Sequence, residues 1–143
     1  MKQIVLLVLI ISTAFFLNSC KKNSAPINDT YAIILGKWDI INDSTFVGIG
    51  ISNHALNYIG QAGDYFDFRT DSIIYTKEGS VLDTLSYRLT SNNTIIISSF
   101  GIIINGMPDT SHITNLTGHS LMITAPDIIT PAGIFGRKVS LSR

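Results

Sequence analysis

Residues 64–89 read DYFDFRTDSIIYTKEGSVLDTLSYRL and alternate between strand-like segments and turns. Phe66 and Phe68 share one face of the first segment, and Thr70-Asp71 then forms a turn. Residues 72–77 return along the first segment with Ile73 and Tyr75 on one side, which predicts a β-hairpin. A second turn at residues 78–80 leads into a third segment, whose shared apolar face consists of Val81, Leu85, Tyr87 and Leu89.

The same pattern of short apolar runs between turn residues continues on both sides of this stretch. Ile, Thr and Tyr, which favour strands, are common, and Glu78 is the single glutamate in the chain. Further strands are expected at residues 37–42, 94–98, 112–116, 121–124 and 135–141. Because the links between these segments are mostly short, the sequence predicts an all-β fold: a small antiparallel up-and-down β-barrel of about eight strands.

Composition excludes several classes of protein. The chain has 143 residues, with 10 Lys and Arg against 10 Asp and Glu, and 14% of its residues are charged. A neutral surface with so few charges does not suit nucleic-acid binding. One cysteine can form neither an internal disulfide nor a cysteine-based zinc cluster. The length corresponds to one ordinary domain.

The N-terminus carries the pattern of a lipoprotein signal peptide. A basic start is followed by an apolar run at residues 4–17, which as a helix would span roughly 21 Å. That length is short of the ~30 Å hydrocarbon core of a membrane but typical of a signal peptide. The run ends at Leu17-Asn18-Ser19-Cys20, which resembles a bacterial lipobox. The resemblance implies cleavage before Cys20 and attachment of lipid to its sulfur.

The chain therefore divides into three expected parts. Residues 1–19 form the signal peptide, residues 20–30 a polar lipid-anchored tether, and residues 31–143 the barrel domain. Two or three acyl chains on Cys20 would hold the protein stably at a membrane. Lys21 rather than Asp follows the cysteine, and by resemblance to enterobacterial sorting this favours the outer membrane. The predicted location is the periplasmic leaflet of that membrane in the cell envelope.

Gly36-Lys37-Trp38 opens the first expected strand, and a long loop and the Phe66/Phe68 hairpin follow it. This order resembles the lipocalin-like domain of many lipoproteins from Bacteroidetes. In lipocalins the Gly-x-Trp tryptophan packs at the closed end of the barrel beneath an arginine from near the C-terminus. The resemblance implies that Arg137 lies over Trp38 as a structural pair at the barrel end. Lys138 and Arg143 are the alternatives to Arg137.

The segment of residues 43–63 does not fit the rhythm of strands and turns. It is rich in glycine yet also carries large apolar side chains, as binding loops often do. A turn of helix is the favoured structure for residues 54–59, with a short strand as the alternative. Together with residues 102–104, its apolar side chains either line a ligand or partner site at the barrel mouth or plug the barrel, and the plug is the favoured alternative. These candidates are Phe46, Leu56, Tyr58 and Ile59.

No pattern in the sequence indicates catalysis, a metal site or a cofactor. His54, His112 and His119 lie far apart in the chain, without the spacing of metal ligands. Asp64 and Asp67 stand three residues apart in a strand, so their carboxylates should face opposite sides and cannot act as an acid–base pair. The chain is therefore expected not to be an enzyme.

Two functions fit these observations. The first is a membrane-anchored, lipocalin-like protein that binds a small apolar molecule in the cell envelope. The alternative is a protein-interaction or structural accessory module with a filled barrel, whose partner the sequence does not identify. An interior cavity of a few hundred Å³ with apolar walls would favour the first function, and a solid core with an exposed apolar patch the second.

Overall fold

The computed structural model describes residues 27–48, 54–101, 110–131 and 133–143. Within these ranges the chain forms one short helix and ten strands. The elements are α2 (Ile27–Ile34), β1 (Gly36–Gly48), β2 (His54–Ile59), β3 (Tyr65–Phe68), β4 (Ile73–Glu78), β5 (Val81–Ser91), β6 (Thr94–Ile97), β7 (Thr110–Thr114), β8 (Ser120–Thr124), β9 (Ile128–Thr130) and β10 (Gly133–Ser142).

Eight of the strands form a closed antiparallel barrel, which confirms the predicted fold class. The barrel follows the order β1, β3, β4, β5, β6, β7, β8 and β10, and β10 closes it by pairing with β1. Each of the eight strands expected from the sequence is present within a few residues of its predicted position. Neighbouring strands around the barrel are mostly consecutive in the sequence, as in an up-and-down arrangement.

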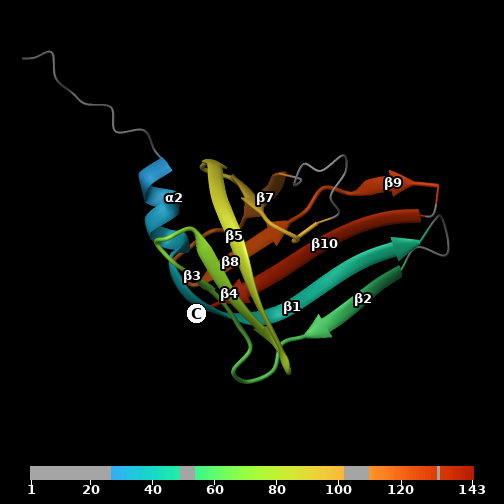
Figure 1. Cartoon of the computed structure of the whole chain (residues 1–143), viewed down its shortest axis with the longest axis horizontal. Coiled ribbons are helices and arrows are strands. Elements are labelled where there is room, and N and C mark those ends of the chain that lie inside the picture. The colour runs from blue at the N-terminus through green and yellow to red at the C-terminus, as the bar shows by residue number, and fades with distance from the viewer. Residues whose placement is uncertain (1–26, 49–53, 102–109, 132) are drawn as a thin grey trace, which may run out of the picture.

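The longest barrel strands continue beyond the closed part. β1 pairs first with β3 and then, further along, with β2 on the same side. β10 pairs with β8 near its C-terminal end and with β9 near its N-terminal end. The four strands β2, β1, β10 and β9 therefore form a sheet that extends past one end of the barrel, on the right in Figure 1.

A β-bulge in β1 separates these two regions. Ile40 pairs with Leu141 and Asn42 with Ser140, so Ile41 is an extra residue with no counterpart on β10. Trp38 and Ile40 face the core before the bulge. Because one additional residue reverses the alternation of side chains, the inward positions after it are odd-numbered, beginning with Asp43.

The opposite end of the barrel is filled and capped. Trp38 is fully buried there, and its indole nitrogen donates a hydrogen bond of 2.8 Å to the carbonyl oxygen of Ile34 in α2. The rings of Phe68 and Tyr87 pack edge to face, with centroids 5.4 Å apart. α2 covers this end (Figure 1), and buries Ile34 completely against the core.

The predicted pairing of Arg137 with Trp38 is wrong, and Arg143 occupies that place. The Arg143 guanidinium lies 4.1 Å from the centroid of the Trp38 ring and donates hydrogen bonds to the carbonyl oxygens of Ile33 and Leu35. The strand register explains the error. Arg137 does face inward, but it pairs with Thr45 and so lies at the opposite end of the barrel.

Three other local predictions need correction. Residues 54–59 form strand β2 rather than a turn of helix, because they find hydrogen-bonding partners along the exposed edge of β1. β9 was not predicted. α2 begins at Ile27, inside the segment assigned to the tether, and Thr30 is buried where its hydroxyl donates to the carbonyl oxygen of Asn92.

The predicted signal peptide and Cys20 lie outside the described residues. Among the residues that the structure describes, no helix is long and apolar enough to cross a membrane. The helix, the ten strands and the core all lie between residues 27 and 143. A chain of residues 21–143, which lacks Cys20, therefore retains every described element of the fold.

Candidate functional site

A cavity of about 570 Å³ opens at the end of the barrel opposite Trp38, beneath the extended sheet. This volume falls within the range of small-molecule sites, about 300–1,000 Å³. The floor of the cavity is the barrel core, and its sides come from several strands and loops. The lining residues are Asp43, Thr45, Leu56, Asn57, Tyr58, Glu78, Phe100, Gly101, Ala125, Pro126, Phe135, Gly136 and Arg137.

Strand alternation places the key side chains on the inner wall. On β10, Phe135 and Arg137 share the inward face with Val139 and Leu141 of the core. On β1, the bulge at Ile41 turns Asp43 toward the same inner face, where Asp43 pairs with Val139 of β10. The charged side chains of two paired strands therefore meet inside the barrel rather than on its surface.

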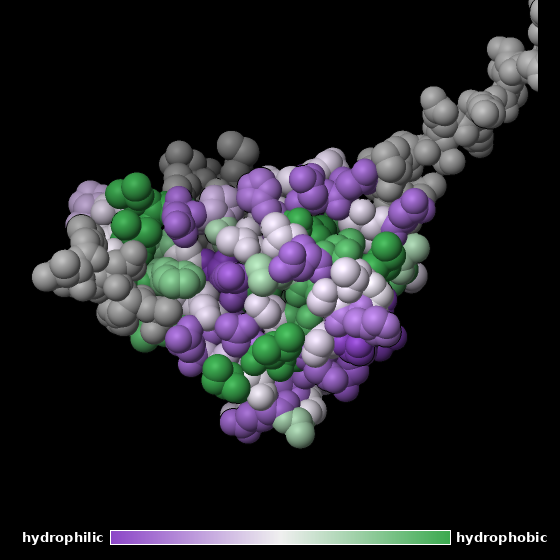
Figure 2. All heavy atoms as spheres, turned by 180° about the vertical axis from the view of Figure 1, so that it is seen from behind, coloured by the Kyte–Doolittle hydropathy of each residue, from purple (hydrophilic) through white to green (hydrophobic). Residues whose placement is uncertain are grey.

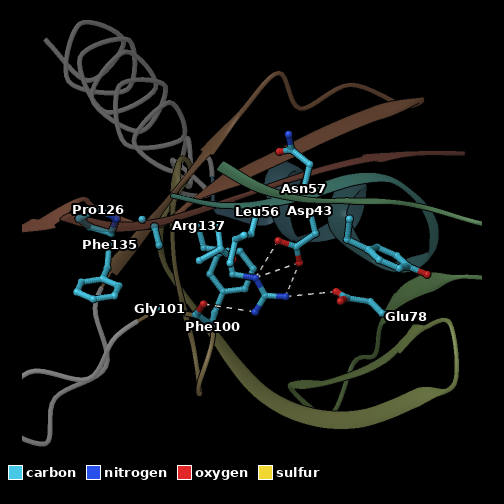
Figure 3. Close-up of a pocket in the computed structure, with 13 residues that line it drawn as sticks. Asp43, Leu56, Asn57, Glu78, Phe100, Gly101, Pro126, Phe135 and Arg137 are labelled. Carbon is cyan, nitrogen blue, oxygen red and sulfur yellow. Dashed lines mark hydrogen bonds and ion pairs between the residues drawn. The ribbon is translucent and has the colours of Figure 1, made fainter. Parts of the chain in front are cut away.

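Arg137 is the centre of the polar part of the cavity (Figure 3). Its Nε donates to both carboxylate oxygens of Asp43, at 3.1 and 3.0 Å, and its Nη2 also contacts Asp43. A second ion pair joins Nη2 to Glu78 at 3.3 Å. The guanidinium lies 4.6 Å from the centroid of the Phe100 ring. Several partners thus fix the orientation of Arg137.

Glu78 is the carboxylic acid whose titration is most altered by this environment. Burial raises the pKa of Glu78 to about 7, and the neighbouring Asp43 carboxylate contributes in the same direction. The positive charge of Arg137 acts the other way and does not compensate. Near neutral pH, Glu78 therefore exchanges between its charged and neutral forms at the wall of the cavity.

A second carboxylate holds the β2 side of the cavity in place. Asp64 is 2% exposed and accepts hydrogen bonds from the backbone nitrogens of Gln61 and Gly79, each at 2.9 Å. The Tyr58 hydroxyl also donates to Asp64. This hydrogen bond lowers the pKa of Asp64 and raises the pKa of Tyr58 to about 12. Asp64 therefore anchors Tyr58 and the turn after β4.

Apolar groups form most of the remaining wall. Phe135, Pro126 and Phe100 approach the cavity from β10 and from the loops after β8 and β6 (Figure 3). Leu56 enters from β2 and is 58% exposed, so it offers apolar surface that the protein itself does not cover. The cavity thus combines an apolar wall with one group of charged side chains, as ligand sites commonly do.

Only some of the residues of the predicted loop site lie at the cavity. Leu56 and Tyr58 line the cavity, as the ligand-site interpretation requires. Phe46 and Ile59 alternate with the inward positions of their strands; they are exposed and do not line it. Residues 102–104, the other predicted part of the mouth, lie outside the described residues.

The structure shows no metal site in the described part of the chain, where no three His, Cys, Asp or Glu side chains cluster as metal ligands would. His112 and His119 lie on or beside different strands. Asp64 and Asp67 have separate roles, as expected from their spacing. Asp64 binds Tyr58 and backbone groups, whereas Asp67 forms a surface ion pair with Arg69 at 2.7 Å.

Most of the polar site does not follow from the sequence. Arg137 was assigned to the wrong end of the barrel, although its inward orientation and that of Phe135 could be found from their spacing to Val139. Asp43 faces inward only because of the bulge at Ile41. No glycine or other turn residue at this position indicates a bulge in the sequence. Glu78 lies at a predicted hairpin turn, where an exposed position is the ordinary expectation.

Comparisons with known proteins add no identification. A scan against family models, a search of curated proteins and a search of solved structures each found no match to this chain. The function is therefore inferred from the residues that line the cavity.

Proposed function

We propose that this protein is a membrane-anchored, lipocalin-like carrier that binds a small apolar molecule in the cell envelope and has no catalytic role. In this proposal Cys20 carries the lipid, and the barrel is held at the periplasmic leaflet of the outer membrane. The apolar molecule occupies the cavity between the barrel core and the extended sheet.

The cavity is the observation that carries the proposal. About 570 Å³ is open above the packed barrel core, at the end away from Trp38. Exposed apolar surface inside a cavity is costly in water and is the feature that a buried apolar ligand would relieve. Leu56 and Phe135 supply such surface.

The alternative function, an interaction module, has one observation in its favour. Ile41, Phe46 and Ile59 are exposed on β1 and β2, outside the set of residues that line the cavity. On the face shown in Figure 2, however, apolar side chains form small patches separated by hydrophilic ones. Among the described residues, that face therefore shows no broad apolar docking surface. The carrier function is preferred because of the cavity.

Titration with a neutral apolar dye that fluoresces on leaving water tests the carrier function. The chain of residues 21–143 should bind the dye saturably, with one site per chain. Thr45→Trp places a large side chain into the cavity from β1 and should weaken binding at least about tenfold. Thr84→Trp, at an exposed position of β5, is the matched control and should bind as the wild type does.

Circular dichroism should first establish that both variants keep the β-rich spectrum. Absence of saturable binding by the wild-type chain, or equal binding by Thr45→Trp, would overturn the carrier function.

The proposed anchor needs a separate test. In full-length protein expressed in a bacterium that processes lipoproteins, Cys20 should incorporate labelled fatty acid, and the protein should fractionate with membranes. Cys20→Ser should abolish the label. Persistent labelling of Cys20→Ser would contradict lipidation at this residue.

A further inference from the structure

On the basis of the carrier function above, we propose that the ligand of this cavity is amphipathic, with an apolar chain and one positively charged nitrogen. Glu78 receives that nitrogen, while the chain lies against Leu56, Phe100 and Phe135. The ligand class is therefore a long-chain or bulky apolar amine, rather than a fatty acid or a neutral hydrocarbon.

The charges in the cavity wall favour a positively charged ligand. Three lining residues carry charge: Asp43 and Glu78 are acidic and Arg137 is basic. Asp43 is satisfied by Arg137, which contacts its carboxylate through both Nε and Nη2. Glu78 is then the second carboxylate on a guanidinium that is already paired. With both acids ionised, the group has one negative charge in excess, and a single cation would neutralise it.

Accessibility also singles out Glu78. The side chain of Asp43 is 5% exposed and lies behind Arg137, whereas that of Glu78 is 28% exposed. In Figure 3 the carboxylates of Asp43 and Glu78 both contact Nη2 of Arg137, and they lie within hydrogen-bonding reach of each other. A ligand entering the open end of the barrel can therefore reach Glu78 without breaking the pair between Arg137 and Asp43.

The same geometry disfavours an anionic head group. A ligand carboxylate could reach the Arg137 guanidinium only by competing with Asp43 and Glu78, and it would add a third negative charge to the group. Like charges at such separations repel strongly in a partly buried site. An ammonium group meets the opposite situation, since it forms a charge-assisted hydrogen bond with Glu78, which shares its guanidinium partner with Asp43.

Binding of an amine should depend on pH through Glu78. The ionisable groups that act on Glu78 are Asp43 of β1, Arg137 of β10, and Asp64 in the turn before β3; Tyr58 of β2 lies near enough to sense its charge. Because the pKa of Glu78 is raised to about 7, Glu78 is largely neutral below that pH. The attraction for a cation then weakens.

Isothermal titration calorimetry with three eight-carbon probes tests this proposal on the chain of residues 21–143. The probes are octylamine, octanol and octanoate; one of the eight carbons of octanoate belongs to its carboxylate. At about pH 8 octylamine should bind at least about tenfold more tightly than octanol, and octanoate more weakly than octanol, since a hydrogen bond between charged groups is worth about that factor or more. At about pH 5, where Glu78 is protonated, the ratio of amine to alcohol affinity should approach one.

Glu78→Gln should likewise reduce the ratio of amine to alcohol affinity to about one at the higher pH. Asp39→Asn, an exposed acid of β1 at the closed end of the barrel, is the matched control and should keep the wild-type ratio. If Glu78→Gln does not fold, the pH series on the wild-type chain gives the same information.

The outcomes separate the two proposals. Equal binding of all three probes, or tightest binding of octanoate, would overturn the charged-nitrogen ligand and leave the carrier function intact. Failure of every probe to bind would overturn the carrier function itself.

Discussion

Single residues at the open end of the barrel determine how the protein responds to pH. Glu78 has a pKa raised from 4.5 to about 7, so the native protein holds a proton that the unfolded chain releases between these values. The free energy of unfolding should therefore decrease as pH rises from about 4.5 to about 7, by about 1 to 3 kcal/mol in the ligand-free chain.

Urea unfolding at a series of pH values measures this effect. Glu78→Gln should remove most of the decrease and be more stable than the wild type near pH 8, because its amide cannot lose a proton. Asp39→Asn, at an exposed position of β1 at the closed end of the barrel, should retain the wild-type slope. A wild-type protein whose stability rises through this window would contradict the assignment.

The pair between Arg137 and Asp43 gives a second prediction at the residue scale. Asp43→Ala should cost about 1 to 3 kcal/mol, because it leaves a largely buried guanidinium with only Glu78 as an acidic partner. Adding Arg137→Met removes that charge, so the double variant should be more stable than Asp43→Ala alone. Asp67→Ala breaks the pair with Arg69, whose side chain is 57% exposed, and should cost less than about 1 kcal/mol.

Denaturant unfolding of these variants checks the prediction. Additive losses in the double variant would show that Arg137 and Asp43 do not act as a pair.

At the scale of elements, the bulge in β1 connects the fold to the cavity. Gly60 follows β2 and its backbone nitrogen donates to the carbonyl oxygen of Ile41, the bulged residue. A Cβ at Gly60 would lie 1.8 Å from the carbonyl oxygen of Ile40, a clash with backbone that no rotamer can relieve. Glycine is therefore required where β2 leaves the bulge.

Gly60→Ala should lower the free energy of unfolding by more than about 2 kcal/mol, because the bulge must shift to admit the methyl group. It should also weaken dye binding, since the bulge is what turns Asp43 and Thr45 inward. Gly118→Ala is the control, because a Cβ there meets no atom within 4 Å. Thermal unfolding that is unchanged in Gly60→Ala would contradict this role of the bulge.

Some features of these strands can be predicted from the sequence, and others cannot. Alternation of apolar residues and turn chemistry locate the eight barrel strands, because both are local properties of the chain. The end of the barrel at which Arg137 lies depends on the register between β1 and β10, where Arg137 and Asp43 are 94 residues apart in the sequence. Asp43 depends on the bulge, which forms opposite β10. Long-range pairing determines both. β2, in contrast, pairs with the strand directly before it, with His54 opposite Val47.

At the scale of the whole molecule, the barrel has two different ends. One is closed by Trp38, α2 and Arg143, whose guanidinium also donates 2.9 Å to the carbonyl oxygen of Gly118. The other extends into a sheet that leaves a cavity between apolar and charged side chains. A rigid closed end that supports an open binding end is the arrangement that a carrier needs, since binding residues work best on elements fixed by packing.

Native mass spectrometry of the chain of residues 21–143, produced in its native host, tests the carrier function most directly. We expect the wild-type chain to carry an added mass that corresponds to one small molecule and is released on activation in the gas phase. Thr45→Trp should lack this added mass. A wild-type chain that emerges only at its bare mass, together with a stoichiometric protein partner, would contradict the carrier function and favour the interaction module.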